Sequence, residues 1–185
     1  MKKFVLTYGL LSGLIVAIGS AIHLVMMDDK DHLDLSGGQV VGYTVMVVAF
    51  IAVFFGIRAY RDQHQGGAIT FGRAFKVGIL TALVTCAMYI IGWQILYYGF
   101  MPDFGEKYTA ASIAKMQSEG KTAAEIATAK AEMAKFWEMY QNPLVNIAIT
   151  FIEIFPVALI MVLISAGILR RKEPAGEGVQ QLARS

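Results

Sequence analysis

The residue with the clearest capacity for chemistry is Glu153, an acid inside the strongly apolar run 144–169. A carboxylate at the centre of a membrane helix costs roughly 2.5–3.5 kcal/mol on insertion scales, so it needs a partner or a function. Pro156 follows one turn later and removes the amide that would otherwise bond the carbonyl of Ile152. Together these residues predict a local polar site at membrane depth, of the kind that carries a proton or an ion.

The side chains expected beside Glu153 follow from depth along the apolar runs. A helix rises by about 1.5 Å per residue. By this rise, Tyr89 on the third run lies closer to the membrane centre than Glu153, and Gln94 lies farther from it. Ser20 on the first run lies near the level of Gln94. We expect Glu153 to face the bundle and to share hydrogen bonds with Tyr89 or Gln94, with Ser20 as a further partner. A structural role and a proton-carrying role both remain open.

The other polar clusters do not fit a reaction or a cofactor. The acidic segment 28–34 and His23 offer ligands for a divalent cation, but their spacing matches neither a calcium loop nor a zinc motif. Gly66 and Gly67 lack the surrounding pattern of a phosphate-binding loop. Cys86 has no base beside it in its apolar run. We therefore expect no enzymatic activity, no metal ion, no cofactor and no nucleic-acid partner.

Composition identifies the elements that must position Glu153. Of the 185 residues, 56% are hydrophobic and only 16% are charged, whereas soluble domains contain about 25% charged residues. A helix of about 20 apolar residues spans a bilayer. We predict an all-α membrane protein, a single domain over 1–172, with four transmembrane helices in an antiparallel bundle. The spans lie near 4–27, 40–57, 75–100 and 144–169.

The first span has two further features. A cleaved signal peptide has an apolar core of only about 7–15 residues, whereas this run continues to Met27, so we interpret it as a retained span. Small residues recur at every fourth position, which would let another helix approach closely. The frequency of glycine in membrane helices explains the pattern equally well. The small residues are Gly9, Gly13, Ala17 and Ala21.

The segment 102–141 is the only long stretch predicted outside the membrane. Thr122 and Glu125 form a capping box, which predicts a helix start. Apolar residues then follow at heptad spacing, as Ile126, Met133 and Tyr140. This stripe favours packing against a neighbouring helix, the membrane surface, another membrane protein or a second copy of the chain.

Basic residues predict the orientation. They flank the first span, the second loop and the end of the last span, while the first loop is acidic. The positive-inside rule then places both termini in the cytoplasm and 102–141 on the outer side. The tail 173–185 is expected to be a disordered cytoplasmic segment.

The order of these stretches resembles a bacterial membrane family, domain of unknown function 4199. The resemblance covers nearly the whole chain and rests on the combination of stretches. It implies an integral protein of the bacterial cytoplasmic (inner) membrane, and it supplies no activity or catalytic residue. The matching stretches are Lys2-Lys3 with the glycine-containing first span, 68–78, 102–108, Asn142-Pro143, 153–156, 163–166 and 170–172.

Two functions of different classes are consistent with these residues. The first is a non-enzymatic scaffold or accessory subunit, which contacts the lipid bilayer and a membrane-protein partner or second copy through 121–141. The second is a small proton- or ion-coupled transporter in which Glu153 is the titrating group. Whether Glu153 lines a water-filled cavity is the observation that separates them.

Overall fold

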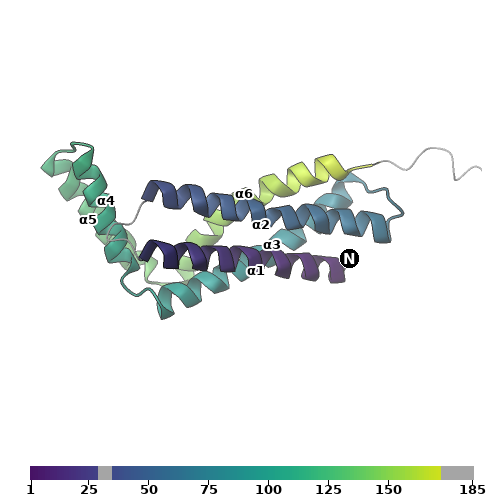
Figure 1. Ribbon diagram of the computed structural model, residues 1–185, viewed down its shortest axis with the longest axis horizontal. Coiled ribbons are helices and arrows are strands. Elements are labelled where there is room, and N and C mark those ends of the chain that lie inside the picture. The colour runs from purple at the N-terminus through teal and green to yellow at the C-terminus, as the bar shows by residue number, and fades with distance from the viewer. Residues whose placement is uncertain (29–34, 172–185) are drawn as a thin grey trace, which may run out of the picture.

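The computed structural model describes residues 1–28 and 35–171, and every regular element within these ranges is a helix. The expected all-α architecture is confirmed (Figure 1). The acidic segment 28–34 and the tail 173–185 lie outside the residues whose side chains are described, so the expectations for them stay predictions. The helices are α1 (Lys2–Asp28), α2 (Leu35–His64), α3 (Phe71–Gly99), α4 (Phe104–Ser118), α5 (Ala123–Tyr140) and α6 (Pro143–Leu169).

Four of these helices are long and apolar enough to cross a membrane: α1, α2, α3 and α6. Large apolar side chains such as Leu14, Ile95 and Ile168 lie exposed on their outer faces, with exposed fractions of 50%, 57% and 66%. A soluble bundle keeps its exposed apolar patches small. Helices that are apolar on both inner and outer faces are expected in lipid. The fold is therefore that of a four-helix membrane protein.

The four long helices form an antiparallel bundle. Helices α1 and α6 each pack against both α2 and α3, so α1 and α6 occupy opposite corners. The core between them is closely packed, with Phe50, Ile57, Val77 and Val162 fully buried. The N-terminus and the end of α6 lie at one end of the bundle, and the α4–α5 hairpin lies across the other (Figure 1).

The small residues of α1 are in close contact with α3. A Cβ atom added at Gly13 would lie 2.5 Å from the Cβ of Met88, and one at Gly9 would lie 2.7 Å from the Cβ of Val84. Neither distance is sterically possible without a shift of one helix. The close-approach interpretation of this ridge is therefore confirmed for Gly9 and Gly13.

The hairpin is joined by a turn at Gly120, whose φ of +74° favours glycine. The capping box is present: the Thr122 side chain accepts a hydrogen bond from the Glu125 amide, and the Glu125 carboxylate accepts one from the Thr122 amide. The indole nitrogen of Trp137 donates to the Thr109 hydroxyl at 2.9 Å, which fastens α5 to α4. The predicted helix after Thr122 is thus confirmed, and its apolar side meets protein.

At the end of the bundle opposite the hairpin, backbone hydrogen bonds join two distant segments. The amide of Ile69 donates to the carbonyl of Arg171, and the amide of Arg171 donates to the carbonyl of Ile69. This pairing ties the start of α3 to the end of α6. The basic residues Arg58, Arg61 and Arg73 belong to the same end, far along the helices from Glu153.

Candidate functional site

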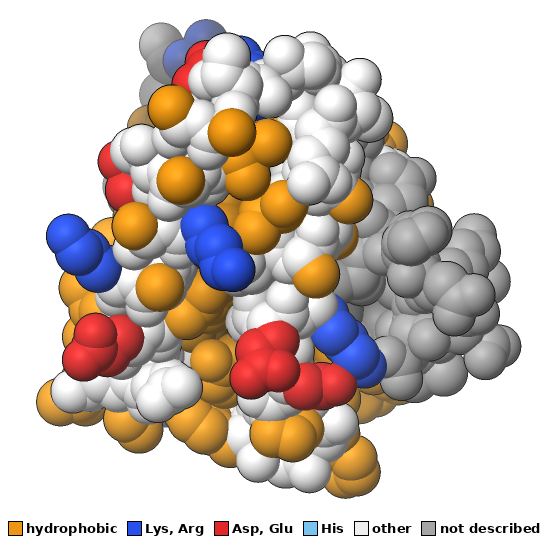
Figure 2. All heavy atoms as spheres, turned by 90° about the vertical axis from the view of Figure 1, so that its left-hand side faces the viewer, with side chains coloured by type: hydrophobic (Ala, Val, Ile, Leu, Met, Phe, Trp, Pro, Cys, Tyr) orange, Lys and Arg blue, Asp and Glu red, His pale blue; other side chains and the backbone are white. Residues whose placement is uncertain are grey.

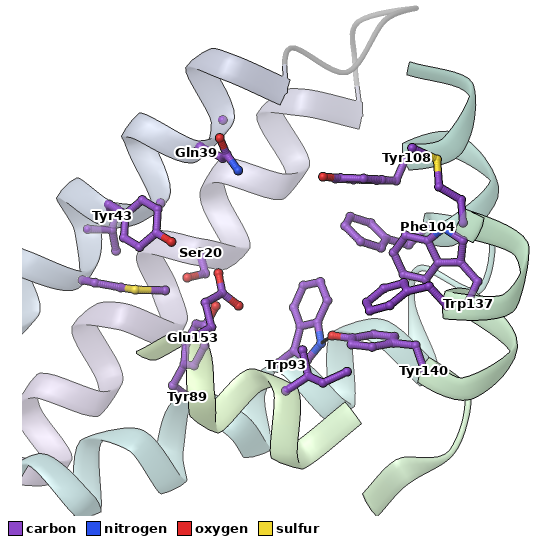
Figure 3. Close-up of a pocket in the computed structure, with 17 residues that line it drawn as sticks. Ser20, Gln39, Tyr43, Tyr89, Trp93, Phe104, Tyr108, Trp137, Tyr140 and Glu153 are labelled. Carbon is purple, nitrogen blue, oxygen red and sulfur yellow. Dashed lines mark hydrogen bonds between the residues drawn. The ribbon is translucent and has the colours of Figure 1, made fainter. Parts of the chain in front are cut away.

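A cavity of about 380 Å³ lies between the bundle and the α4–α5 hairpin (Figure 3). All six helices contribute to its lining. The volume falls within the roughly 300–1,000 Å³ typical of small-molecule sites. The lining residues are Ser20, Gly38, Gln39, Gly42, Tyr43, Val45, Met46, Tyr89, Trp93, Phe104, Tyr108, Met133, Phe136, Trp137, Tyr140, Ile149 and Glu153.

The bundle side of the cavity contains the acid predicted from the sequence. Glu153 from α6, Ser20 from α1 and Tyr89 from α3 all line it, and Figure 3 shows them grouped together with Tyr43 of α2. Three of the four predicted site residues are therefore brought together. Glu153 is the only charged side chain among the described lining residues, and its carboxylate points into the cavity (Figure 3).

The fourth predicted residue, Gln94, lies outside the lining and has another partner. Its side-chain amide donates to the Asn146 side-chain oxygen at 2.7 Å. The structure gives Glu153 no hydrogen bond to Tyr89 or Gln94, contrary to our expectation. The depth of a residue along its helix does not determine which face of α6 contacts Gln94. In the structure, that face carries Asn146.

Asn146 and Thr150 form a buried polar pair that our sequence argument missed. The Thr150 hydroxyl lies 2.8 Å from the Asn146 carbonyl and 3.3 Å from its side-chain oxygen. Among the described residues, the Asn146 side-chain nitrogen is the one buried side-chain polar atom without a hydrogen-bond partner. The signal was present in the sequence, because polar residues at 146, 150 and 153 follow helical spacing.

The opposite wall of the cavity is aromatic. Phe104 and Tyr108 of α4 and Trp137 of α5 face Glu153 across the open space (Figure 3). Their rings pack mainly edge to face, with centroids 5.9 Å apart for Phe104 and Trp137 and 5.6 Å apart for Tyr108 and Trp137. Edge-to-face packing is a favoured aromatic geometry, so these rings form a preorganised wall. None of these three rings was assigned to a site in the sequence analysis.

A hydrogen bond between two side chains joins this wall to the bundle. The indole nitrogen of Trp93 on α3 donates to the Tyr140 hydroxyl on α5 at 2.8 Å. Burial raises the pKa of the Tyr140 hydroxyl above its ordinary value. Tyr140 therefore stays protonated and can donate as well as accept.

The rest of this end of the molecule has no single sign of charge. Lysine and acidic side chains stand among apolar ones over the hairpin face (Figure 2). Within residues 1–28 and 35–171, no three His, Cys, Asp or Glu residues are grouped so that they could hold a metal ion. The described lining residues do not form the oxygen-rich shell that Mg²⁺ or Ca²⁺ requires. The arrangement is suited to binding an organic molecule.

Comparison with known proteins gives one match. The family model described as "Protein of unknown function (DUF4199)" matches residues 7–171. No curated protein matches. No solved structure matches either.

Proposed function

Because the chain belongs to the family described as protein of unknown function DUF4199, which names no activity, we propose a role from the cavity itself. The protein is a non-enzymatic, multi-pass component of the bacterial cytoplasmic membrane. It binds a small organic ligand between the bundle and the α4–α5 hairpin and serves as an accessory or scaffold subunit. The observation that carries this proposal is the single cavity to which all six helices contribute, with Glu153 at its bundle side.

The proposed orientation places the cavity on the outer side of the membrane. Arg58, Arg61 and Arg73 belong to the end that also holds the N-terminus and the end of α6, and the positive-inside rule assigns that end to the cytoplasm. The hairpin then faces outward and covers the cavity. A ligand would reach Glu153 from the outer aqueous phase or the outer leaflet.

A binding role is favoured over catalysis by the groups present. The described lining residues include one carboxyl group and no histidine, cysteine or lysine. General acid–base or nucleophilic catalysis requires a reactive group within hydrogen-bond reach of a second one. The lining offers aromatic surface and one charge, which are binding groups.

The alternative is a proton- or ion-coupled transporter that uses Glu153. The position of Glu153 in a cavity favours this alternative, because transport requires an accessible charged group at membrane depth. The packed core below the cavity is an argument against it. Ile57, Val77 and Val162 are fully buried between Glu153 and the cytoplasmic end, so a path through the protein would require the bundle to rearrange.

A partner protein or a second copy would contact the outer face of α5. Tyr140 is buried and Met133 lines the cavity, so much of the stripe in 121–141 already meets this chain. Met139, with an exposed fraction of 51%, remains available on this helix. We propose that an accessory contact uses this face.

The test of the binding role uses tryptophan fluorescence. The chain has two tryptophans, and both Trp93 and Trp137 line the cavity. A brominated aromatic molecule in contact with them should quench their emission. The probe is para-bromobenzyl alcohol, which is uncharged and soluble in water, added to the protein in phosphatidylglycerol nanodiscs. We expect saturable quenching.

The control variants fill the cavity or leave it open. A Cβ atom at Gly42 would meet nothing within 4 Å, and Gly42 lines the cavity, so Gly42→Phe should occupy the space and abolish saturable quenching. Gly167 also has open space but lies outside the lining, so Gly167→Phe should behave like the unchanged chain. Quenching that never saturates, or that Gly42→Phe leaves intact, contradicts the binding role. In proteoliposomes with a pH-sensitive dye, proton movement that Glu153→Gln abolishes would favour the transporter.

A further inference from the structure

We propose that the ligand of this cavity is an organic cation: a substituted ammonium group carrying an apolar or aromatic body. This inference rests on the proposed binding role and names the chemical class of the ligand. Three observations support it: the unpaired charge of the lining, the aromatic wall opposite that charge, and the absence of ligands suited to an inorganic ion among the described lining residues.

Glu153 supplies the charge of the described lining. None of the ion pairs among the described residues includes Glu153. The nearest arginines along the fold belong to the other end, where Arg58 and Arg61 pair with Asp62. A carboxylate inside a largely apolar cavity is stabilised strongly by a cation that enters beside it. An anionic ligand would instead place a like charge beside Glu153.

The aromatic wall of the cavity also favours a cation. Figure 3 shows Tyr108 and Phe104 of this wall, together with Trp93 of α3, around the space that Glu153 faces. The faces of aromatic rings carry negative electrostatic potential, and they attract a cation by about 0.5–1 kcal/mol at exposed sites and about 2 kcal/mol when water is excluded. Aromatic rings on one side and a carboxylate on the other therefore favour the same charge.

The described lining residues suit an organic cation better than a metal ion. Small inorganic cations require several oxygen ligands to replace their water. The described lining has one carboxylate, and its remaining polar side chains carry hydroxyl groups, indole nitrogens and the single amide of Gln39. A substituted ammonium group needs fewer such ligands, because its apolar substituents gain from contact with Met46, Met133 and Phe136.

The described surface of the hairpin end does not select the sign of the ligand. Lysine and acidic side chains are mixed over the hairpin end (Figure 2). A field of one sign is required for long-range steering of charged ligands. In this proposal Glu153 selects the charge of the ligand. A single substitution of Glu153 therefore tests the selection.

The experiment compares three probes with the same ring and different head groups. They are para-bromobenzyl trimethylammonium, para-bromobenzyl alcohol and para-bromobenzoate, and each is titrated against the emission of Trp93 and Trp137 in phosphatidylglycerol nanodiscs. We expect the cation to bind at least roughly tenfold more tightly than the alcohol, since one tenfold step corresponds to about 1.4 kcal/mol. The anion should bind more weakly than the alcohol.

Two variants test which side chains produce the preference for the cationic probe. Glu153→Gln should weaken binding of the cation roughly tenfold and leave binding of the alcohol unchanged. The alcohol thus reports whether the variant keeps its folded cavity. Tyr108→Leu removes a ring of the wall and should weaken the cation more than the alcohol. Tyr98→Leu, which changes an exposed aromatic residue outside the lining, should change neither.

The outcomes separate this inference from the binding role. If the alcohol quenches saturably and the cation binds no more tightly, or if Glu153→Gln leaves the preference for the cation unchanged, the binding role stands and the cation inference is wrong. If neither probe quenches saturably, the binding role itself fails. Adding phosphatidylethanolamine to the nanodiscs identifies the source: competition with the cationic probe indicates a lipid ammonium group, and unchanged affinity indicates a free molecule.

Discussion

The indole nitrogen of Trp93 donates a hydrogen bond to the hydroxyl oxygen of Tyr140 at 2.8 Å, across 47 positions of the chain. Trp93 belongs to the membrane helix α3 and Tyr140 to the last turn of α5. This bond therefore joins the bundle to the hairpin at the edge of the cavity.

Replacement of Tyr140 by phenylalanine should loosen the hairpin. The change removes the acceptor and leaves a partly buried indole N–H unpaired, which costs about 1–3 kcal/mol. We expect faster amide hydrogen exchange along α5 and little change in the core of α3. The matched control is Tyr98→Phe. The Tyr98 hydroxyl donates at 2.9 Å to the exposed carbonyl of Gln141, and water can replace that bond. Equal effects of the two variants would contradict a special role for the Trp93–Tyr140 bond.

Addition of one methyl group at Gly13 should destabilise the bundle. In Gly13→Ala the new Cβ would lie 2.5 Å from the Cβ of Met88, so α1 must move away from α3. Overpacking of this kind typically costs about 1–3 kcal/mol. Thermal unfolding in detergent should show a lower midpoint than for the unchanged chain. Gly42→Ala is the control, since its methyl group meets nothing within 4 Å. A midpoint as high as that of the control would show that the two helices are not so closely packed.

The sequence was sufficient to predict the bundle but not the cavity. Run length and apolar content depend on local composition, so the spans could be located without knowing their neighbours. The capping box of α5 is also local. The cavity depends on how the hairpin lies over the bundle, which brings Phe104 and Trp137 opposite Glu153. Such a juxtaposition involves residues far apart in the chain, and no short pattern encodes it.

The position of Gln94 shows the same limit of sequence-based prediction for a single residue. Its depth was predicted from the rise of a helix, and that argument placed it near Glu153. A residue at a given depth can face any of several neighbours, and the rotation of α6 places Asn146 opposite Gln94. The helical spacing of 146, 150 and 153 would have indicated a polar face of α6. It would not have shown which member meets α3 and which meets the cavity.

Acid should weaken the start of α5 through Glu125. Hydrogen bonds from the Thr122 amide and hydroxyl hold the pKa of Glu125 below its ordinary value, with a smaller contribution from Lys121. A carboxyl group whose pKa is lowered in the folded state stabilises that state above its ordinary pKa, and the contribution is lost as the pH falls through the lowered value. Thermal unfolding in detergent between neutral and acid pH should therefore depend less on pH in Glu125→Gln. Glu132→Gln should keep the pH dependence of the unchanged chain, and an identical profile for all three proteins would contradict the assignment.

Cysteine labelling tests the proposed orientation of the whole molecule. Ser118 lies at the end of α4 and is exposed, so Ser118→Cys should react in intact cells with a maleimide that cannot cross the membrane. Ser185→Cys, in the tail outside the described residues, should react only after the cells are opened. The native Cys86 is buried, with an exposed fraction of 1%, and should give little background, which a Cys86→Ala chain removes altogether. The positive-inside argument requires this pattern, because the basic residues cluster at the end opposite α4. Labelling of Ser185→Cys in intact cells, with protection of Ser118→Cys, would reverse the orientation and place the Glu153 cavity on the cytoplasmic side.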